Sequence, residues 1–537
     1  MITFWLQRAN SMDIQTIGKI NKETKKVQSD FSKFSLALLF VAVVFVWTFT
    51  THGTSDNNIF LILGAIFGAY MAMNIGANDV ANNVGPAVGS KALTLFGAIF
   101  IAAIFEAAGA FIAGGDVVKT IKNGIIDPAY FSDPNVFIWA MAAALLSAAL
   151  WLNFATSIGA PVSTTHSIVG GVMGAGVASA GFAIVAWGTM GKIVASWIIS
   201  PLLGGIIAAG FLFFIKKKII YKKDIISSAK KFVPILIAIM AWAFITYIML
   251  KGVNQIIKIN FLTASGIGLV AAIGIYIYVK PIIAKSSDKL SPDRASVNTL
   301  FNIPLIFSVA LLSFAHGAND VANAIGPLAA IHDAVLHSNI RGSVAIPLWV
   351  MAVGAIGIVI GLALYGPKLI KTVGSEITDL DQIRAFCIAM AAALTVIVAS
   401  QLGLPVSSTH IAIGAVFGVG FLREWLHTTE KVHLIETREK FKKDKKELQE
   451  YNQQLDTLIA LEYKSKNDYE QIVLLHRMID DKEELVKNEK KEFKSAKNVE
   501  LVKRDAVKKI IAAWLITVPA AALLSAGIFF MIKGIML

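Results

Sequence analysis

The sequence predicts an all-α polytopic membrane protein, and three observations lead to this prediction. Apolar residues make up 56% of the 537 residues and charged residues only 16%, whereas soluble chains carry about 25% charged residues. Many stretches reach the roughly 20 apolar residues that a membrane-spanning helix needs. Several motifs also occur twice, once in each half of the chain. This composition excludes a soluble globular enzyme.

Eleven stretches qualify as membrane spans by their length and apolar composition. They are 34–51, 58–75, 92–113, 135–152, 192–215, 232–250, 261–279, 301–315, 344–365, 383–400 and 510–532. Two further segments, 160–180 and 405–422, are apolar but are interrupted by Gly, Pro, Ser and Thr. We expect these two segments to form broken or re-entrant helices rather than regular spans.

The distribution of lysine predicts the orientation in the membrane. The first 33 residues are polar and basic, but they are too long and mixed for the charged start of a secretory signal. Lysines also gather in the loops 216–231 and 280–294, which the positive-inside rule places in the cytoplasm. We therefore expect a multi-pass cell-membrane protein with a cytoplasmic N-terminus and an outside C-terminus. The net charge of +13 has the same origin, so we expect no nucleic-acid partner.

An internal duplication defines the architecture. The repeated pairs are GANDVAN at 76–82 and 317–323, PVSTTH at 161–166 with PVSSTH at 405–410, and KIVASWIISP at 192–201 with KIIAAWLITVP at 509–519. The first repeat begins outside and ends at the basic loop 216–231 inside, so it crosses the membrane an odd number of times. The second repeat begins inside, and the same number of crossings takes it outward. The two repeats therefore have inverted topology.

The motifs and charges together divide the chain into segments. The predicted organisation is a cytoplasmic N-terminus with an extra span at 1–56, a first repeat at 57–215, a basic linker with a two-span hairpin at 216–299, a second repeat at 300–422, a cytoplasmic insertion at 423–509 and the final span of the second repeat at 510–537. The insertion is identified because the last motif is displaced by about 73 further residues in the second half.

The insertion 423–509 carries 40 of the 85 charged side chains in the chain. Apolar residues recur in it at seven-residue intervals, at Leu434, Phe441, Leu448 and Leu455 and again at Ile472, Ile479, Val486 and Phe493. A turn is expected at 463–468, so the pattern predicts an antiparallel helical hairpin of the coiled-coil type on the cytoplasmic face. Such a hairpin is either a solvated helix pair without a ligand or a docking arm, a regulatory arm or a dimer contact.

The duplicated motifs place polar residues inside apolar surroundings. Asn78, Asp79 and Asn82 recur as Asn319, Asp320 and Asn323, with glycines and a proline beside them. Irregular backbone is tolerated in a membrane only where it is buried or lines a wet cavity. We therefore expect the helix to break at each GANDVAN motif.

Each PVS motif contains a cluster of Ser and Thr residues, which we call its hydroxyl cluster. The cluster directly follows a proline, Pro161 in the first motif and Pro405 in the second. Proline favours the first turn of a helix, and the N–H groups and hydroxyls of that turn form a site for an oxyanion. The neighbouring carboxylates would repel an anion unless they accept its proton or hold a cation. The pattern thus indicates a transporter that moves Na⁺ or H⁺ together with an anion, and the alternative is that Asn, Ser and Thr only join helices.

The doubled GANDVAN and P-V-S-[ST]-T-H motifs resemble the inorganic phosphate transporter (PiT) family of secondary carriers. The resemblance covers 57–215, 300–422 and 510–532. It implies inverted repeats, Na⁺- or H⁺-coupled symport of inorganic phosphate by alternating access, a homodimer, and no cofactor beyond the transported cation. The implied phosphate-binding residues are Asn78, Asp79, Asn82, Ser163, Thr164 and Thr165 in one half and Asn319, Asp320, Asn323, Ser407, Ser408 and Thr409 in the other.

Glu106 is a departure from the symmetry of the two repeats. The family commonly has a glutamate at this position, but Ile358 occupies the matching position of the second half. The nearest lysine in sequence, Lys119, lies about 20 Å further along a helix, which excludes a salt bridge within the helix. We therefore expect a proton or a Na⁺ ion at Glu106 and favour Na⁺. The expected coupling-ion residues are Asp79, Asp320, Asn82, Asn323 and Glu106.

Two other functions are compatible with the same residues. The protein could carry another oxyanion such as sulfate, although Asp79 and Asp320 favour phosphate, which has a proton to share. It could also be an anion sensor that signals through its hairpin without transporting. The residues His166 and His410, which end the PVS motifs, are either titrating groups or packing residues. No HExxH, CxxC or Walker pattern occurs, so we expect no enzymatic activity.

Overall fold

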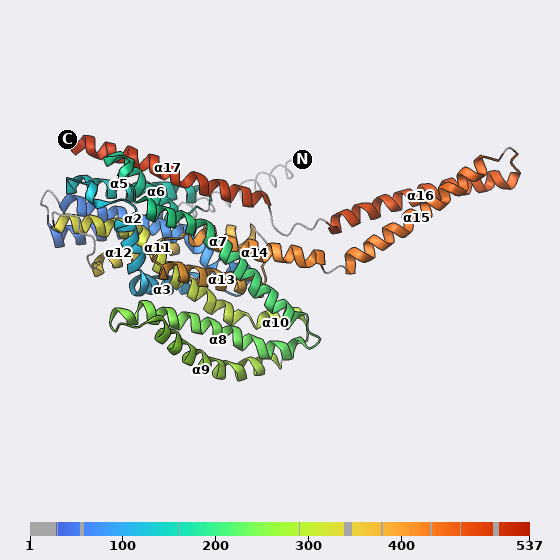
Figure 1. Cartoon of the computed structure of the whole chain (residues 1–537), viewed down its shortest axis with the longest axis horizontal. Coiled ribbons are helices and arrows are strands. Elements are labelled where there is room, and N and C mark those ends of the chain that lie inside the picture. Colours follow the sequence, from blue (N-terminus) through green and yellow to red (C-terminus); the bar gives the residue numbers. More distant parts are fainter. Residues whose placement is uncertain are drawn as a thin grey trace, which may run out of the picture. The chain divides into compact units, whose positions relative to one another are not determined.

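The computed structural model describes residues 28, 30–53, 58–160, 162–288, 290–337, 346–376, 380–429, 432–461, 463–497 and 504–536. In these residues the chain is helical almost throughout, and the one β-bridge joins Ile126 to Val185 (Figure 1). Two parts of the prediction lie outside the described residues. They are residues 1–27 of the predicted cytoplasmic N-terminus and Pro161, the first residue of the first PVS motif.

Within the described part of the chain, eleven helices are long and apolar enough to cross a membrane. They are the helix Asp30–His52, α2 (Asn58–Gly89), α3 (Leu95–Ala113), α5 (Pro134–Ser157), α7 (Trp187–Ile215), α8 (Ile225–Lys251), α9 (Phe261–Ser287), α11 (Asn302–His337), α12 (Leu348–Glu376), α13 (Gln382–Gln401) and α17 (Arg504–Met536). Each predicted span overlaps one of these helices. The prediction of an all-α polytopic membrane protein is confirmed.

The predicted helix breaks at the GANDVAN motifs are wrong. Helices α2 and α11 run without interruption through both motifs and even continue past Pro86 and Pro327. The reason is that the Asn and Asp side chains find partners on neighbouring helices, so no backbone groups have to be freed. The predicted spans 58–75 and 301–315 are consequently only parts of two much longer helices.

The predicted breaks before the hydroxyl clusters are present. Helix α6 (Thr164–Ala180) follows α5 after a short connection, and α14 (Ser408–Thr429) follows α13 in the same way. Both connections contain a glycine with positive φ, +76° at Gly159 and +67° at Gly403. A side chain is disfavoured in this conformation, and the residue lets each chain turn sharply from one helix into the next.

Glycines bring the two repeats into backbone contact in a reciprocal pattern. A Cβ atom added at Gly76 of α2 would collide with the carbonyl group of Ile358 on α12, and one added at Gly317 of α11 would collide with that of Glu106 on α3. The same reciprocity holds for Gly109 against Phe314 and for Gly361 against Met73. The residue pairs correspond to one another in the two repeats, so the duplicated sequence forms a duplicated packing arrangement.

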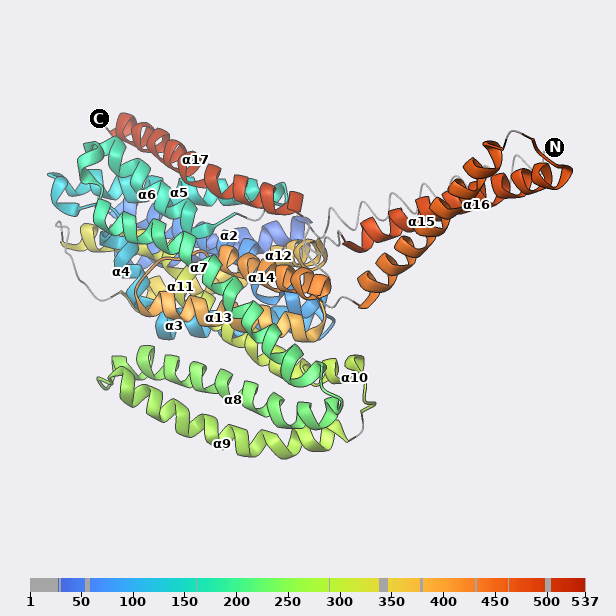
Figure 2. The same ribbon diagram turned by 45° about the vertical axis from the view of Figure 1, so that its right-hand side comes forward.

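The last helix of each repeat packs against the other repeat. Gly170 and Gly174 of α6 allow close approach to α17, while Gly414 and Gly418 of α14 allow close approach to α7. Figures 1 and 2 show α17 lying beside α5 and α6. The final span, although it follows a long insertion in the sequence, therefore completes the packing around the first repeat.

Helices α8 and α9 follow the first repeat and precede the second in the sequence. They form a two-helix hairpin at one side of the other membrane-spanning helices (Figure 2). Lys230 of α8 pairs with Asp288 directly after α9, which ties the two ends of the hairpin together. Beyond α9, the short helix α10 (Arg294–Thr299) leads into α11, and Arg294 pairs with Asp381 at the start of α13.

Residues Gly420–Lys503 form a compact unit of their own. Helices α15 (Val432–Ile459) and α16 (Lys466–Lys497) pack antiparallel, with Leu455, Leu475 and Ile479 buried between them. Lys482 of α16 lies 2.6 Å from Glu447 and 2.9 Å from Asp444 of α15. Its hydrogen bonds to Glu447 and Asp444 raise the pKa of the Lys482 ammonium group. Of the predicted apolar stripe, Leu434 and Phe493 have side chains outside the described set.

Gly317→Ala should destabilise the protein by about 1–3 kcal/mol, the range typical of overpacking, because the added methyl group meets backbone that cannot move aside. Gly266→Ala on α9 is the matched control, since nothing lies within 4 Å of its added Cβ atom. The measurement is the thermal unfolding midpoint of the detergent-purified variants. Equal midpoints for the two variants would show that the α3–α11 crossing is looser than described.

Candidate functional site

The twelve residues predicted to bind phosphate converge on one buried region. They lie in the middle of α2 and α11 and at the starts of α6 and α14, and none is more than 3% exposed. The structure brings together all of the predicted residues, although they come from four separate segments. Their side chains interact both within each repeat and between the repeats.

Each motif aspartate accepts a hydrogen bond from the hydroxyl cluster of its own repeat. The Thr164 hydroxyl group donates to Asp79 Oδ2 over 2.9 Å, and the Ser408 hydroxyl group donates to Asp320 Oδ2 over 2.8 Å. Thr164 and Ser408 occupy equivalent positions in the two PVS motifs. The hydroxyl groups therefore stabilise carboxylates that would otherwise be buried without a partner.

The motif asparagines link one repeat to the other. Asn82 donates over 2.9 Å to the Thr409 hydroxyl group, which itself donates over 2.9 Å to Asp79 Oδ1. In the opposite sense, Asn323 donates to Thr165 over 3.1 Å and to Thr164 over 3.3 Å. The site is thus built from both repeats, and neither repeat completes it alone.

The first asparagine of each motif contacts a hydroxyl group that sequence reasoning missed. Asn78 donates to Thr156 over 3.1 Å, and Asn319 donates to Ser400 over 2.9 Å. Thr156 and Ser400 each lie five residues before the proline of a PVS motif. That equal spacing is the signal that could have identified them. These contacts fix the last turns of α5 and α13 to the two motif helices.

Ser163 and Ser407 cap the helices that begin at the site. The Ser163 hydroxyl oxygen accepts a hydrogen bond of 3.1 Å from the backbone N–H group of His166, and the Ser407 hydroxyl oxygen accepts one of 3.2 Å from that of His410. The first intrahelical bond of α6 runs from Ser167 N to Ser163 O. The backbone N–H groups of a first helical turn have no partner within the helix, which is what makes a helix N-terminus suited to bind an anion.

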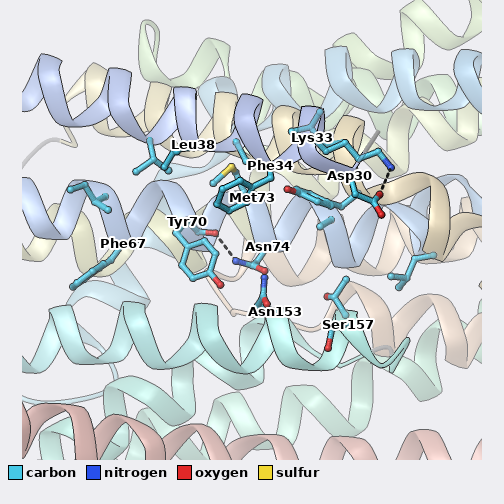
Figure 3. A pocket seen from close by; sticks show the side chains of 18 of the residues that line it. Asp30, Lys33, Phe34, Leu38, Phe67, Tyr70, Met73, Asn74, Asn153 and Ser157 are labelled. Atoms are coloured by element: carbon cyan, nitrogen blue, oxygen red, sulfur yellow. Dashed lines mark hydrogen bonds and ion pairs between the residues drawn. The ribbon is translucent and has the colours of Figure 1, made fainter. Parts of the chain in front are cut away.

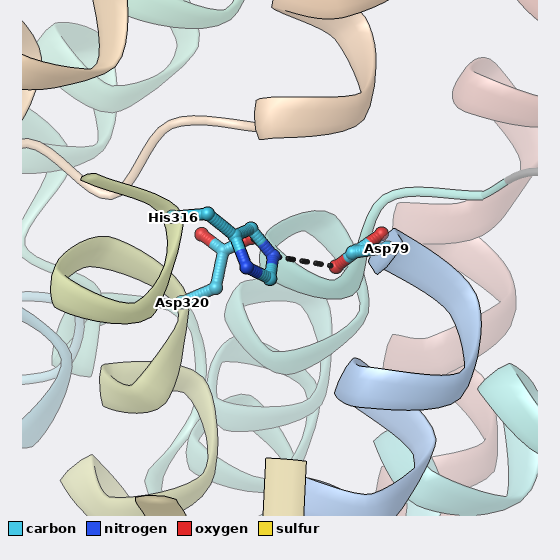
Figure 4. Close-up of side chains that lie close together, drawn as sticks. All are labelled: Asp79, His316 and Asp320. Carbon is cyan, nitrogen blue, oxygen red and sulfur yellow. Dashed lines mark ion pairs between the residues drawn. The ribbon is translucent and has the colours of Figure 1, made fainter. Parts of the chain in front are cut away.

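His316 is the main functional residue that the sequence analysis missed. Its Nε2 lies 3.0 Å from Asp320 Oδ2 and 3.6 Å from Asp79 Oδ2, and the side chain is fully buried (Figure 4). His316 directly precedes the second GANDVAN motif, where the first repeat has Ile75. The loss of symmetry at this position was a visible signal. The three residues place ligand atoms within 4.8 Å of one another, as a bound cation would need.

Glu106 has partners on two other helices, contrary to the isolation that the sequence analysis assumed. Asn83 donates to Glu106 Oε1 over 2.8 Å, and Nδ1 of His316 lies 3.3 Å from the same oxygen. The expectation that only a proton or Na⁺ could accompany Glu106 is therefore wrong. It failed because the argument considered only the helix on which Glu106 lies. The second repeat has Ile358 and Ala324 at the corresponding positions, so this cluster exists once.

The site offers two kinds of ligand. Hydroxyl groups and helix N-termini are donors for an oxyanion. Among the described residues, several buried oxygens receive no hydrogen bond, namely Asn78 Oδ1, Asn83 Oδ1, Asn319 Oδ1, Asn323 Oδ1, Asp320 Oδ1 and Glu106 Oε2. Oxygen atoms of this kind are ligands for a hard cation. The arrangement can hold an anion and a cation at once.

His166 and His410 belong to a cluster of four rings, in which the two imidazoles meet edge to face. The two imidazole rings lie 4.4 Å apart between their centroids, and they contact Trp197 at 3.8 Å and Trp514 at 3.6 Å. Both histidines are at most 5% exposed. These contacts favour the packing role, and they join α6 and α14 to the closing helices α7 and α17.

The fold, with its membrane-spanning helices, and a buried polar site built from both repeats are those of a membrane transporter. A model of the phosphate transporter family matches residues 75–525. This match covers most of the chain, and the chain belongs to the phosphate transporter family, a family of transporters rather than of enzymes.

Individual relatives agree with this assignment. The chain is 50% identical over 532 residues to a Helicobacter pylori protein named "Putative phosphate permease", with 96% of this chain and 98% of that protein covered. A similarly named permease of Pyrococcus abyssi is 40% identical over 368 residues, which cover 68% of this chain and 90% of the relative. A solved structure of a sodium-dependent phosphate transporter is 30% identical, with a TM-score of 0.71 and coverage of 88% of this chain and 99% of that chain.

Thr409→Val should destabilise the protein by about 1–3 kcal/mol, because Asp79 Oδ1 and Asn82 each lose a buried partner. Thr395→Val is the matched control, since the Thr395 hydroxyl group bonds only to the carbonyl of Ala391 in its own helix. Thermal unfolding of both variants in detergent measures the difference. If the two variants unfold at the same temperature, the contact between the repeats contributes nothing.

Proposed function

We propose that this protein imports inorganic phosphate by symport with Na⁺. The observation that carries the proposal is one buried site in which two helix N-termini meet three carboxylates. The N-termini and hydroxyl groups suit a tetrahedral oxyanion. The carboxylates suit a cation, and the family to which the chain belongs supplies phosphate as the anion.

The charge of the site supports coupling to a cation. Asp79, Asp320 and Glu106 are fully buried, and His316 supplies at most one positive charge among them. A charge buried in a membrane protein costs several kcal/mol unless it is neutralised. Phosphate would add further negative charge. Cations must therefore enter the site with the anion.

Two observations favour Na⁺ over H⁺ as that cation. The buried amide and carboxylate oxygens without a hydrogen bond are the ligands that Na⁺ takes in such transporters. The structural relative of the chain is named as sodium-dependent. The expected coupling residues are the motif pairs Asp79 with Asn82 and Asp320 with Asn323, together with Glu106.

The transport cycle we propose is alternating access between two inverted repeats. The reciprocal glycine contacts and the exchanged helices α7 and α17 support a two-fold relation between the repeats. The lysine distribution supports a cytoplasmic N-terminus and an outside C-terminus. The homodimer implied by the family resemblance stays a prediction.

Uptake by purified protein in liposomes tests the function. Radiolabelled phosphate is supplied with a Na⁺ gradient or a pH gradient imposed separately, and sulfate is added as competitor. We expect that the Na⁺ gradient drives uptake and that sulfate does not compete with phosphate. If the pH gradient alone drives uptake, the coupling ion is H⁺ and not Na⁺. Competition by sulfate indicates a carrier of several oxyanions. Phosphate binding without flux indicates a sensor.

Asp79→Asn and Asp320→Asn should each abolish Na⁺-driven phosphate uptake while leaving folded protein in the membrane. The substitution keeps the shape of the side chain but removes the negative charge that balances the cation. Uptake in liposomes measures the effect, and size-exclusion chromatography verifies folding. Near-normal uptake by either variant would make that aspartate structural and refute a site shared by both repeats.

Glu106→Gln should weaken the Na⁺ dependence of uptake more than it weakens phosphate binding. The amide preserves the volume near Asn83 and His316 but removes one negative charge. The measurement compares the half-saturating Na⁺ concentration with the dissociation constant for phosphate. A change in phosphate affinity with unaltered Na⁺ dependence would assign Glu106 to the anion instead.

Deletion of residues 430–505 with a short linker should leave measurable phosphate uptake. The hairpin of α15 and α16 lies in a compact unit of its own. The Pyrococcus relative matches only 68% of this chain although 90% of its own length is covered, so it lacks a part of this chain. Topology is checked with a cysteine at Asn467, which we expect to be inaccessible to impermeant reagents outside intact cells. Complete loss of uptake by folded deletion protein would assign the hairpin a role in transport.

A further inference from the structure

A large cavity reaches almost to the candidate site from one direction. It has a volume of about 1030 Å³ and lies between the helix Asp30–His52, α2, α5 and α12 (Figure 3). Its lining includes Ala77 and Thr156, and the hydroxyl group of Thr156 accepts the hydrogen bond of Asn78. The cavity thus reaches the first motif at Ala77 and borders the hydroxyl partner of Asn78.

The wall of this cavity is mainly apolar, and its polar side chains gather away from the end that Leu38 and Phe67 line (Figure 3). Asn74, Asn153 and Ser157 contribute to this wall. At the beginning of the first helix, Asp30 and Lys33 also line it, and their side chains are 65% and 38% exposed. The cavity therefore joins the site region to the end of the protein that the lysine pattern predicts to be cytoplasmic.

The duplication identifies the counterpart of this cavity in the second repeat. Aligned by the GANDVAN motif, the lining residues Met73 and Ala77 correspond to Phe314 and Ala318. Aligned by the PVS motif, Asn153 corresponds to Ile397. These counterparts belong to a packed apolar cluster that also contains Ala113.

Helix α8 supplies the side chains that fill the counterpart. Tyr247 is 1% exposed and its ring lies 6.0 Å from that of Phe314, while the ring of Phe244 lies 5.4 Å from the same residue. Both rings meet Phe314 edge to face, a favourable aromatic arrangement. Ile248 and Ile397 pack against the same cluster.

A buried lysine of α8 contacts the residues next to this cluster. The ammonium group of Lys251, whose side chain is 6% exposed, lies 2.6 Å from Asp116 Oδ2 of α4 (Gly115–Asn123) and 3.2 Å from the carbonyl oxygen of Ser400. Ser400 is the partner of Asn319, just as Thr156 is the partner of Asn78. Thr120 of α4 also donates to the carbonyl oxygen of Gly403 over 2.7 Å.

We propose that the cavity is the route by which the transported anion passes between the site and the Asp30 side, and that Phe244, Tyr247 and Lys251 of α8 close the equivalent route on the opposite side. The inference rests on the proposed transport function and assigns the linking hairpin a role in it. Opening of the closed route requires these three side chains to withdraw from Phe314, Asp116 and Ser400. Helix α8 is then part of the transport pathway as well as a connection between repeats.

Cysteine labelling with a membrane-impermeant maleimide tests this assignment. Cys387 is the single cysteine and is buried, so Cys387→Ser supplies the background. Asn153→Cys and Ile397→Cys form a matched pair, because they occupy equivalent positions in the open cavity and in its filled counterpart. Protein in liposomes is labelled separately from each side without phosphate, so the result does not depend on which anion is carried.

Asn153→Cys should react from the side that carries Asp30 only, and Ile397→Cys should react at least about tenfold more slowly from either side, because labelling follows the fraction of time that a position is open. Adding Phe244→Ala with Tyr247→Ala, or Lys251→Met alone, should speed labelling of Ile397→Cys from the opposite side by about tenfold. Ile239→Ala, at a partly exposed position of α8, is the control and should change neither rate.

Three results would overturn the proposal. The first is equal labelling of Asn153→Cys and Ile397→Cys when α8 carries no substitution. The second is labelling of Asn153→Cys from the side opposite Asp30. The third is unchanged protection of Ile397→Cys after both kinds of α8 substitution. Failure of phosphate uptake with the expected labelling pattern would instead refute the proposed function and leave the two routes in place.

Discussion

The structure depends on keeping carboxylates in an apolar interior where water cannot solvate them. Asp79 and Asp320 are fully buried, and each is stabilised by hydroxyl groups at the start of a helix. Thr409 reaches Asp79 from the other repeat, so the carboxylate can remain in place only if both repeats are folded together. The pairing of the repeats and the breaks before α6 and α14 follow from this requirement.

Close backbone packing makes that pairing possible. The motif helices approach their neighbours at Gly76 and Gly317, where any side chain would strike a carbonyl group. In membrane proteins small residues allow helices to pack closely, which compensates for the weak hydrophobic drive between them. The glycine of each GANDVAN motif thus serves packing, while the Asn and Asp residues after it serve the site. This division explains why α2 and α11 remain regular helices through motifs that look like helix breaks.

The two repeats depart from two-fold symmetry at two places beside the site. His316, Glu106 and Asn83 form a cluster that has no counterpart in the other repeat. Likewise, an open cavity borders Thr156, whereas Lys251 and aromatic residues of α8 cover Ser400. Inverted repeats alone would treat both sides of the membrane alike. Unequal residues at equivalent positions therefore give the two sides of the site different surroundings.

The sequence by itself determined the spans, the duplication and the twelve converging residues, because span length and motif spacing are local properties that a bilayer and a helix N-terminus constrain directly. The partners of Glu106, the roles of Thr156 and Ser400, and the straight course of α2 and α11 required the tertiary structure. Each depends on which distant segments meet: His316 joins Glu106 across α3 and α11, and Lys251 reaches Ser400 from the linking hairpin. Such contacts arise from helix packing, which no single segment specifies.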